Sequence, residues 1–219
     1  VRLITWRSAV QIRPPQPILV KPMYTFPTNK LHTKRFTHIV KKKRINILDF
    51  GCGVGAWSES DIKNKSFKKI TLFDKNRKLI SSLKKKYKDK KRKINFNKKE
   101  IFKKKYDLVV LCSVIQYISK NEFKKLIVNL KNKSKKTTFL IIDIAKYPRY
   151  FEFILLPLFN IKRFLVSIGL ILNKDYIKTK KYHHNFENYN FLKKKYKIEK
   201  ILNLCDLKFL RYTLVIKEK

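Results

Sequence analysis

Residues 45–55 read Ile-Asn-Ile-Leu-Asp-Phe-Gly-Cys-Gly-Val-Gly, and this stretch decides the fold. Its first six residues form a short apolar run that ends at glycines, which is typical of a buried strand. The chain contains only four glycines, and Gly51, Gly53 and Gly55 are three of them. One glycine suffices for a tight turn, whereas three allow a ligand to approach the backbone closely. The residues from Ala56 onward can open a helix whose N-terminal amides face that ligand.

The sequence downstream of this turn alternates between strand and helix patterns. Further strands are expected at residues 69–74, 94–96, 106–112, 137–144, 197–204 and 210–217. Residues 76–90 carry apolar side chains at helical spacing, and Ser119 with Glu122 predicts a capping box before another helix. This alternation predicts an α/β sheet whose right-handed crossovers place helices on both faces. A ligand crevice is then expected at the carboxyl ends of the strands.

The glycine spacing is G-x-G-x-G, which differs from the dinucleotide-binding pattern G-x-G-x-x-G. With Asp49 two positions before the first glycine, residues 47–55 resemble motif I of the class I S-adenosylmethionine-dependent methyltransferases. The resemblance extends over residues 45–144. It implies a Rossmann-like three-layer α/β sandwich with a mostly parallel seven-stranded sheet and an antiparallel last strand. It also implies S-adenosyl-L-methionine as cofactor, with its methionine part over the glycine turn and held in part by Asp49.

Two further acidic residues fit the pattern of the same family. Asp74 ends the second expected strand, 19 residues after Gly55, where the family uses an acidic side chain to accept hydrogen bonds from the ribose hydroxyls. An aspartate at this point can also be the N-cap of the next helix. Glu100 follows Phe96 by four residues, where the family has an acidic side chain near the adenine, and the amide of Ile101 would face the ring. A solvated glutamate in a lysine-rich loop is the alternative.

Residues 106–118 resemble the family's fourth strand and the loop that follows it. Gln116 and Tyr117 stand where many small-molecule members have two histidines, so the commonest candidate base is missing. Tyr117 and the pair His183 and His184, just before the last strands, are the candidate catalytic residues. Two surface histidines in a polar loop are the alternative for that pair. The resemblance implies cofactor contacts from Asp49, Gly51, Cys52, Gly53, Gly55, Asp74, Lys75, Glu100, Ile101, Cys112 and Ser113.

Basic residues dominate the charge of the 219-residue chain, with 55 lysines and arginines against 15 acidic residues and a net charge of +40. Lysine supplies 45 of the basic residues, so a compositional bias that fills solvated faces with lysine is the first interpretation. A nucleic-acid-binding surface is the alternative and is not favoured, because arginine, the side chain better suited to bidentate hydrogen bonds with nucleic acid, is sparse. The three cysteines are widely separated, so disulfides are not expected and a reducing, cytoplasmic location is favoured. The sequence also predicts no metal site.

Residues 151–172 differ from the rest of the chain, because 15 of these 22 residues are aliphatic or aromatic. Lys162 and Arg163 in the middle make a membrane-spanning helix costly, and Pro157 indicates a break between two short helices. Three interpretations remain open. The segment is an ordinary crossover helix with extra core residues, a lid that lines an apolar substrate pocket, or a helix that lies in a membrane interface.

These patterns divide the chain into a leader and a domain, and the domain contains an insertion. Residues 1–22 are expected to be a disordered or mis-assigned leader, because Met23 is the only methionine and the leader's arginine-to-lysine balance differs from the remainder. Residues 23–219 form the methyltransferase domain, in which residues 147–190 are a helical insertion on the substrate side.

The expected function is methyl transfer to a small-molecule or lipid-linked acceptor. The alternatives are an RNA methyltransferase and a non-catalytic cofactor-binding domain, and peripheral contact with the inner membrane surface is compatible with the first.

Overall fold

The computed structural model of the chain describes residues 45–64, 67–90, 93–96, 100–131, 136–147, 154, 157, 182, 189–202 and 211–219. Its strands are β1 (Ile45–Phe50), β2 (Phe67–Phe73), β3 (Ile94–Asn95), β4 (Leu108–Cys112), β5 (Thr138–Ala145), β6 (Tyr196–Leu202) and β7 (Arg211–Glu218). The α-helices are α2 (Ala56–Asn64), α3 (Arg77–Lys86), α4 (Lys120–Lys131) and α8 (Asn190–Lys193), with short 3-10 turns η2 (Lys88–Lys90) and η4 (Ile115–Tyr117).

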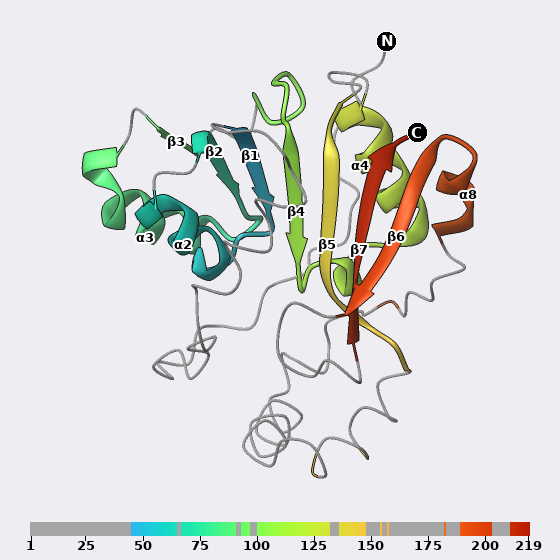
Figure 1. Cartoon of the computed structure of the whole chain (residues 1–219). Coiled ribbons are helices and arrows are strands. Elements are labelled where there is room, and N and C mark those ends of the chain that lie inside the picture. The colour runs from blue at the N-terminus through green and yellow to red at the C-terminus, as the bar shows by residue number, and fades with distance from the viewer. Residues whose placement is uncertain are drawn as a thin grey trace.

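The described strands form one seven-stranded sheet in the order β3-β2-β1-β4-β5-β7-β6 (Figure 1). Strand β1 pairs in parallel with β2 and β4, and β4 pairs in parallel with β5. Strand β7 is antiparallel to both of its neighbours, β5 and β6. This arrangement confirms the predicted mostly parallel sheet with an antiparallel last strand. It also brings the carboxyl ends of β1, β2, β4 and β5 to the same edge as the start of β7.

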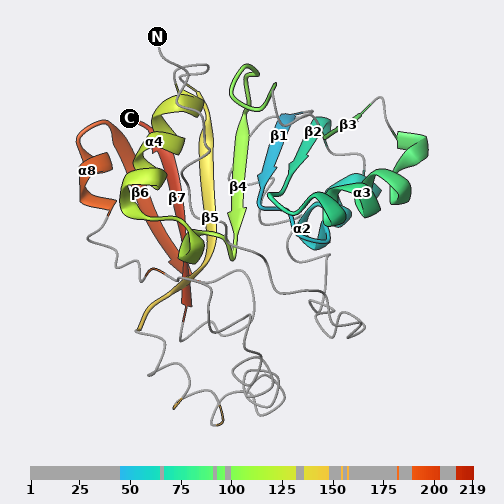
Figure 2. The ribbon, with the colours of Figure 1, turned by 180° about the vertical axis from the view of Figure 1, so that it is seen from behind.

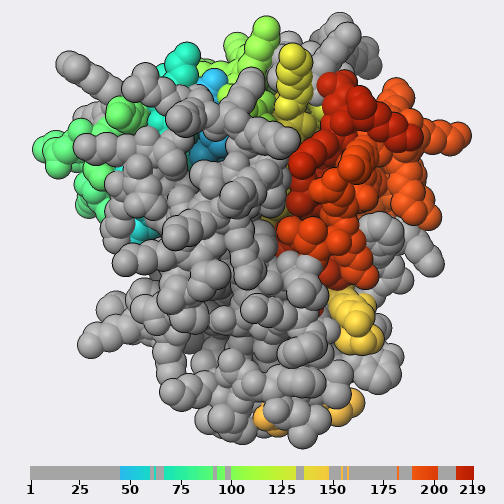
Figure 3. All heavy atoms as spheres, in the orientation of Figure 1, coloured from blue at the N-terminus to red at the C-terminus, as the bar shows by residue number. Residues whose placement is uncertain are grey.

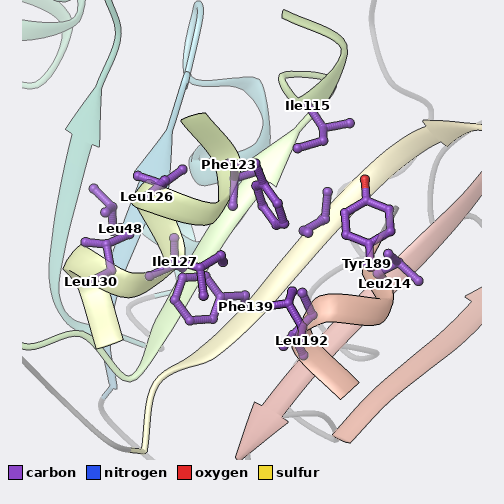
Figure 4. Packing of buried hydrophobic residues seen from close by; sticks show 14 of the residues in the cluster. Leu48, Ile115, Phe123, Leu126, Ile127, Leu130, Phe139, Tyr189, Leu192 and Leu214 are labelled. Carbon is purple, nitrogen blue, oxygen red and sulfur yellow. The ribbon is translucent and has the colours of Figure 1, made fainter. Parts of the chain in front are cut away.

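Each face of the sheet has its own hydrophobic core, because alternate residues of a strand point to opposite faces. Val109 and Leu111 of β4 belong to one cluster with the buried residues of α4 and α8, as Figure 4 shows for α4. Leu108 and Val110 belong to the other cluster, which contains Leu83 of α3. Helices therefore cover both faces, as the alternating pattern predicts.

The helix ends are set by local hydrogen bonds. The capping box before α4 is confirmed, since the Ser119 amide donates to Glu122 Oε2 at 2.8 Å and the Glu122 amide donates to Ser119 Oγ at 3.3 Å. Helix α3 is shorter than the predicted range 76–90 and ends at Lys86. The reason is that Tyr87 leaves the helical conformation (φ −112°, ψ 28°) while its side chain stays buried in the core.

The elements divide into two groups along the sheet. Figure 2 shows, from behind, α2 and α3 beside β1–β3, and α4 and α8 beside β5–β7. In the space-filling view of Figure 3, atoms of β6 and β7 lie at the surface of the molecule. Among the described residues, none of the helices has the length and apolar character needed to cross a bilayer. The leader 1–22 and nearly all of the predicted insertion 147–190 lie outside the described residues.

Candidate active site

The glycine turn, residues 51–55, joins the end of β1 to α2. All three of its glycines have the left-handed φ values that favour glycine: 78° at Gly51, 54° at Gly53 and 76° at Gly55. The amides of Gly51 and Cys52 both donate to the carbonyl of Phe73 at the end of β2, at 2.7 and 2.9 Å. These two main-chain hydrogen bonds fix the turn to the end of the neighbouring strand.

The three glycines have different surroundings. A Cβ added at Gly51 would lie 2.3 Å from a methyl group of Val114, and one at Gly55 would lie 3.0 Å from a methyl group of Leu83. A Cβ added at Gly53 would meet no atom within 4 Å. Gly51 and Gly55 are thus required for packing inside the protein, whereas Gly53 leaves its backbone open to a ligand.

Asp74 follows β2 and is turned toward the glycine turn. Its Oδ2 accepts the Gly53 amide at 2.9 Å and its Oδ1 accepts the Asn76 amide at 2.8 Å. The side chain that caps α3 is Asn76, whose Oδ1 accepts the amides of Lys78 and Leu79 at 3.0 and 3.4 Å. Helix capping therefore does not account for Asp74. A carboxylate has about four acceptor positions, so two N–H donors leave capacity for ligand hydroxyls.

Asp49 lies in β1 and is buried, with 1% of its surface exposed. The Ser58 hydroxyl of α2, itself fully buried, donates to Asp49 Oδ2. This bond ties the end of the strand to the first turns of the helix. Sequence analysis did not single out Ser58. The sequence does contain a signal for it. Ser58 is a small hydroxyl residue early in the helix that follows the glycine turn, and Asp49 lies in the strand just before that turn.

The thiol of Cys52 reports the electrostatics of the turn. Burial is the largest cause that raises its pKa, and the negative charges of Asp49 and Asp74 raise that pKa further. The thiol therefore stays protonated and is not a nucleophile at neutral pH. The same two carboxylates that disfavour a thiolate would stabilise a cation, so the charge at this turn suits a positively charged ligand.

The loop after β4, residues 113–117, packs against the turn. Cys112, which is partly buried, ends the strand, and Ser113 follows in a left-handed conformation (φ 56°). The Ser113 hydroxyl donates to Asp143 Oδ2 at 2.6 Å, and its amide donates to the Ile142 carbonyl at 3.1 Å. Val114 is the residue whose methyl groups cover Gly51.

Asp143 and Arg211 are site-edge residues that sequence analysis missed. Asp143 is buried near the end of β5, and Arg211 Nη1 lies 2.9 Å from its Oδ2 and 3.3 Å from its carbonyl oxygen. The signal in the sequence was a single charge in a strand that is apolar on both faces. Its partners are distant in the chain, and the sequence offers no indication of which residue approaches it.

Tyr117 lies in η4, half-buried, and its amide donates to the Val114 carbonyl at 2.9 Å. The Gln116 carbonyl accepts the amide of Tyr182 at 2.7 Å, so the residue that precedes His183 in the sequence contacts the loop that carries Tyr117. His183 and His184 themselves lie outside the described residues.

The remaining predicted cofactor residues occupy different environments. Lys75 is exposed beside Asp74. Glu100 is partly exposed and forms a salt bridge with Lys104, while Ile101 is buried in the core cluster that includes α4. The structure brings Asp49, the glycine turn, Asp74 and Val114 together, and it shows Glu100 in the lysine-rich loop. Within the described parts of the chain, no cluster of three or more His, Cys, Asp or Glu could hold a metal ion.

The sheet order defines a Rossmann-like domain, and the glycine turn and its carboxylates lie at the carboxyl edge of the sheet, where such folds bind ligands. Residues 48–140 match the family model described as a methyltransferase domain. No curated protein gives a significant match to the sequence. The chain thus carries a methyltransferase domain over residues 48–140, with the fold of S-adenosylmethionine-dependent methyltransferases.

Solved structures share this fold. Magnesium protoporphyrin IX methyltransferase from Synechocystis, solved with SAH bound, is 15% identical, with a TM-score of 0.57 over 87% of this chain and 83% of that one. An S-adenosylmethionine-dependent methyltransferase from Clostridium acetobutylicum is 16% identical, with a TM-score of 0.58 over 85% and 89%. The methyltransferase domain of a bacterial Hen1 protein is 18% identical, with a TM-score of 0.55 over 86% and 97%.

Proposed function

We propose that this methyltransferase acts on a small-molecule or lipid-linked acceptor. The observation that carries the proposal is that, in the sequence, the apolar stretch 151–172 falls between two described points at the carboxyl edge of the sheet. Strand β5 reaches that edge at Ala145, and Tyr182 returns to the loop after β4 through its hydrogen bond to Gln116. A segment with 15 aliphatic or aromatic residues in 22 suits an apolar acceptor.

The proposed cofactor site is built on the glycine turn. The open backbone at Gly53 supports close approach of the methionine part, and the buried Asp49 carboxylate supports its charged end. The ordered carboxylate of Asp74 supports hydrogen bonds to the ribose. Further contacts are proposed for Gly51, Cys52, Gly55, Lys75, Glu100, Ile101, Cys112 and Ser113.

The protein's part in the reaction is alignment and electrostatics. When bound, S-adenosylmethionine would supply a methyl group on a cationic sulfonium, and transfer of that methyl would release the neutral thioether S-adenosylhomocysteine. Asp49 and Asp74 offset positive charge at the turn, and the loop after β4 fixes one wall of the site. A hydroxyl acceptor also needs a proton acceptor, for which we propose Tyr117, His183 and His184. Their removal singly is expected to lower kcat by about 10²-fold if one of them is the general base.

Calorimetry with S-adenosylhomocysteine tests the cofactor site. Asp74→Ala removes the acceptor proposed for the ribose and is expected to raise Kd by about 10-fold or more. Asp89→Ala is the matched control, because it removes the same charge from an exposed carboxylate on η2. An Asp74→Ala variant that is folded and binds like Asp89→Ala would contradict the proposed role.

Transfer of a tritiated methyl group tests the acceptor class. Fractionated lipid, small-metabolite and RNA pools are each incubated with the protein, and label is expected in the lipid or the metabolite fraction. Salt-sensitive labelling of RNA alone would overturn the proposal in favour of an RNA methyltransferase, which the net charge of +40 supports. Flotation with anionic liposomes tests the accompanying proposal that the protein associates peripherally with a membrane surface.

A further inference from the structure

We propose that Asp143 is a positioning residue, which holds the loop after β4 against the glycine turn and thereby sets the affinity for the cofactor. The inference deepens the proposed function, since it rests on the cofactor site proposed at that turn. The contacts of Asp143 that carry the inference are those with Ser113 and Arg211. The effect of Asp143 on the turn runs through Ser113 and Val114.

The carboxylate of Asp143 is held by two partners at one oxygen. Its Oδ2 accepts the Ser113 hydroxyl at 2.6 Å and forms an ion pair with Arg211 Nη1 at 2.9 Å. The side chain of Asp143 is 4% exposed and that of Arg211 is 16% exposed, so solvent screens this pair little. The register of β5 against β7 shifts between Ile141 and Ile144, so Asp143 lies within an irregular stretch of the strand pair.

The backbone at both ends of the Ser113–Asp143 bond is strained. Ser113 (φ 56°) and Asp143 (φ 68°) are the non-glycine residues with positive φ in the part of the chain that the structure describes. Such conformations cost free energy and persist where the surroundings enforce them, often beside functional sites. The hydrogen bond between these two residues is the contact that can enforce both conformations together.

Val114 links the Ser113–Asp143 bond to the glycine turn. Its methyl groups fill the space over Gly51, where a Cβ would come within 2.3 Å of one of them. Val114 follows Ser113 directly, so the backbone conformation of Ser113 sets where Val114 lies. If the Ser113–Asp143 bond is lost, Ser113 can relax to a common conformation and Val114 moves with it. The turn then loses the wall that holds it.

The test measures two quantities for each variant: the Kd for S-adenosylhomocysteine by calorimetry and the Tm of the ligand-free protein. Asp143→Ala and Ser113→Ala are each expected to raise Kd by about tenfold, the effect of one hydrogen bond to a charged group. Asp143→Asn tolerates a positive φ and keeps one acceptor oxygen, so it is expected to recover part of the affinity. It also covers the case in which Asp143→Ala leaves Arg211 unpaired and fails to fold.

Ser119→Ala is the matched control. It deletes the same hydroxyl from a hydrogen bond to a carboxylate, Ser119 Oγ to Glu122 Oε2 at 2.8 Å, at the cap of α4. The expected result is a lower Tm with a Kd within about twofold of the wild type, since a cap contributes to stability alone. A loss of affinity in Ser119→Ala equal to that in Ser113→Ala would overturn the proposal, because general destabilisation would then explain both.

A double-mutant cycle separates positioning from direct contact. If Ser113 acts through Asp143, the double variant Ser113→Ala/Asp143→Ala has about the Kd of either single variant. When the cycle uses Asp143→Asn, adding Ser113→Ala is expected to raise Kd only by the part of the affinity that Asp143→Asn keeps relative to Asp143→Ala. Additive losses, or an Asp143 variant that folds and binds like the wild type, would refute the role of Asp143. A wild-type protein that fails to bind S-adenosylhomocysteine would instead refute the proposed cofactor site itself.

Discussion

The two halves of the site edge are held by different kinds of contact. On the side of β1 and β2, main-chain amides of residues 51–53 bond to the Phe73 carbonyl and to the Asp74 carboxylate. On the side of β4, β5 and β7, three side chains hold one another: Ser113, Asp143 and Arg211. The bonds of the first half come from main-chain amides and depend on residues that permit the backbone shape, with the Ser58–Asp49 bond as its side-chain contact. The second half depends on side chains that match one another.

This difference explains which half can be predicted from sequence. A backbone-built turn has a local signature, because glycine is favoured where φ is positive or a neighbour comes close. A side-chain network has no local signature. The partners of Asp143 lie 30 and 68 positions away in the chain, and only the fold brings them together.

Gly51→Val is the substitution with the largest expected effect. Its side chain would collide with Val114 and would have to adopt a φ of 78°. Overpacking and a left-handed β-branched residue together are expected to lower the unfolding free energy by about 4 kcal/mol, with loss of cofactor binding. Denaturant unfolding and calorimetry with S-adenosylhomocysteine measure the two effects.

Gly53→Ala sharpens the same comparison. Its Cβ would meet no protein atom, so the expected cost is only the backbone strain of about 1 kcal/mol at φ 54°. The methyl group would nevertheless occupy the space proposed for the ligand, and cofactor affinity is expected to fall by about tenfold or more. If Gly53→Ala binds as tightly as the wild type, the ligand does not lie over this turn.

The fold was largely predictable from the sequence, for physical reasons. Central parallel strands are apolar on both faces, so β1, β4 and β5 stand out as short apolar runs between turns. The end of α3 was predicted wrongly, at residue 90 instead of Lys86, because the helical spacing of apolar side chains continues through the buried Tyr87. Side-chain periodicity reports which residues are buried and does not report where the backbone leaves the helix.

Leu130→Ala tests whether the core beneath the β4–β5 half is independent of the cofactor turn. Leu130 is buried at the end of α4, and Figure 4 shows it far along the helix from Ile115, the core residue in the loop after β4. The cavity is expected to lower the unfolding free energy by about 3 kcal/mol. The Kd for S-adenosylhomocysteine is expected to stay within about twofold, since no contact at the turn changes. A large loss of affinity would show that the two halves are coupled through the core.

Cys52 provides a test of the charge at the turn. Because burial and the charges of Asp49 and Asp74 raise its pKa, Cys52 is expected to react slowly with iodoacetamide at pH 8. Asp74→Asn removes one negative charge, which lowers that pKa and is expected to raise the rate of alkylation by about threefold or more. Peptide mapping by mass spectrometry measures the rate at Cys52, with Asp89→Asn as the control for a distant charge.

The raised pKa of Cys52 also gives the sign of a pH effect. The folded thiol keeps its proton above its ordinary pKa of 9.0, whereas the unfolded thiol loses it there. The contribution of Cys52 to stability is therefore complete below pH 9 and falls as the pH rises above that value. Cys52→Ala is expected to flatten this alkaline decline in denaturant unfolding, and a decline that is unchanged would contradict the assignment.

Glu100→Gln is expected to have the smallest effect on stability and to decide between two interpretations of this residue. The salt bridge of Glu100 to Lys104 is largely solvated, so its loss is expected to change the unfolding free energy by less than about 0.5 kcal/mol. Glu199→Gln is a matched control, because Glu199 forms a similar exposed pair with Lys197 at 3.0 Å on β6. Both variants should therefore unfold alike.

If Glu100 approaches the adenine as proposed, only Glu100→Gln weakens S-adenosylhomocysteine binding, by about threefold or more, because a carboxylate is the stronger acceptor for an amino group. Equal affinities for the two variants would mean that Glu100 is one more solvated charge of the lysine-rich loop.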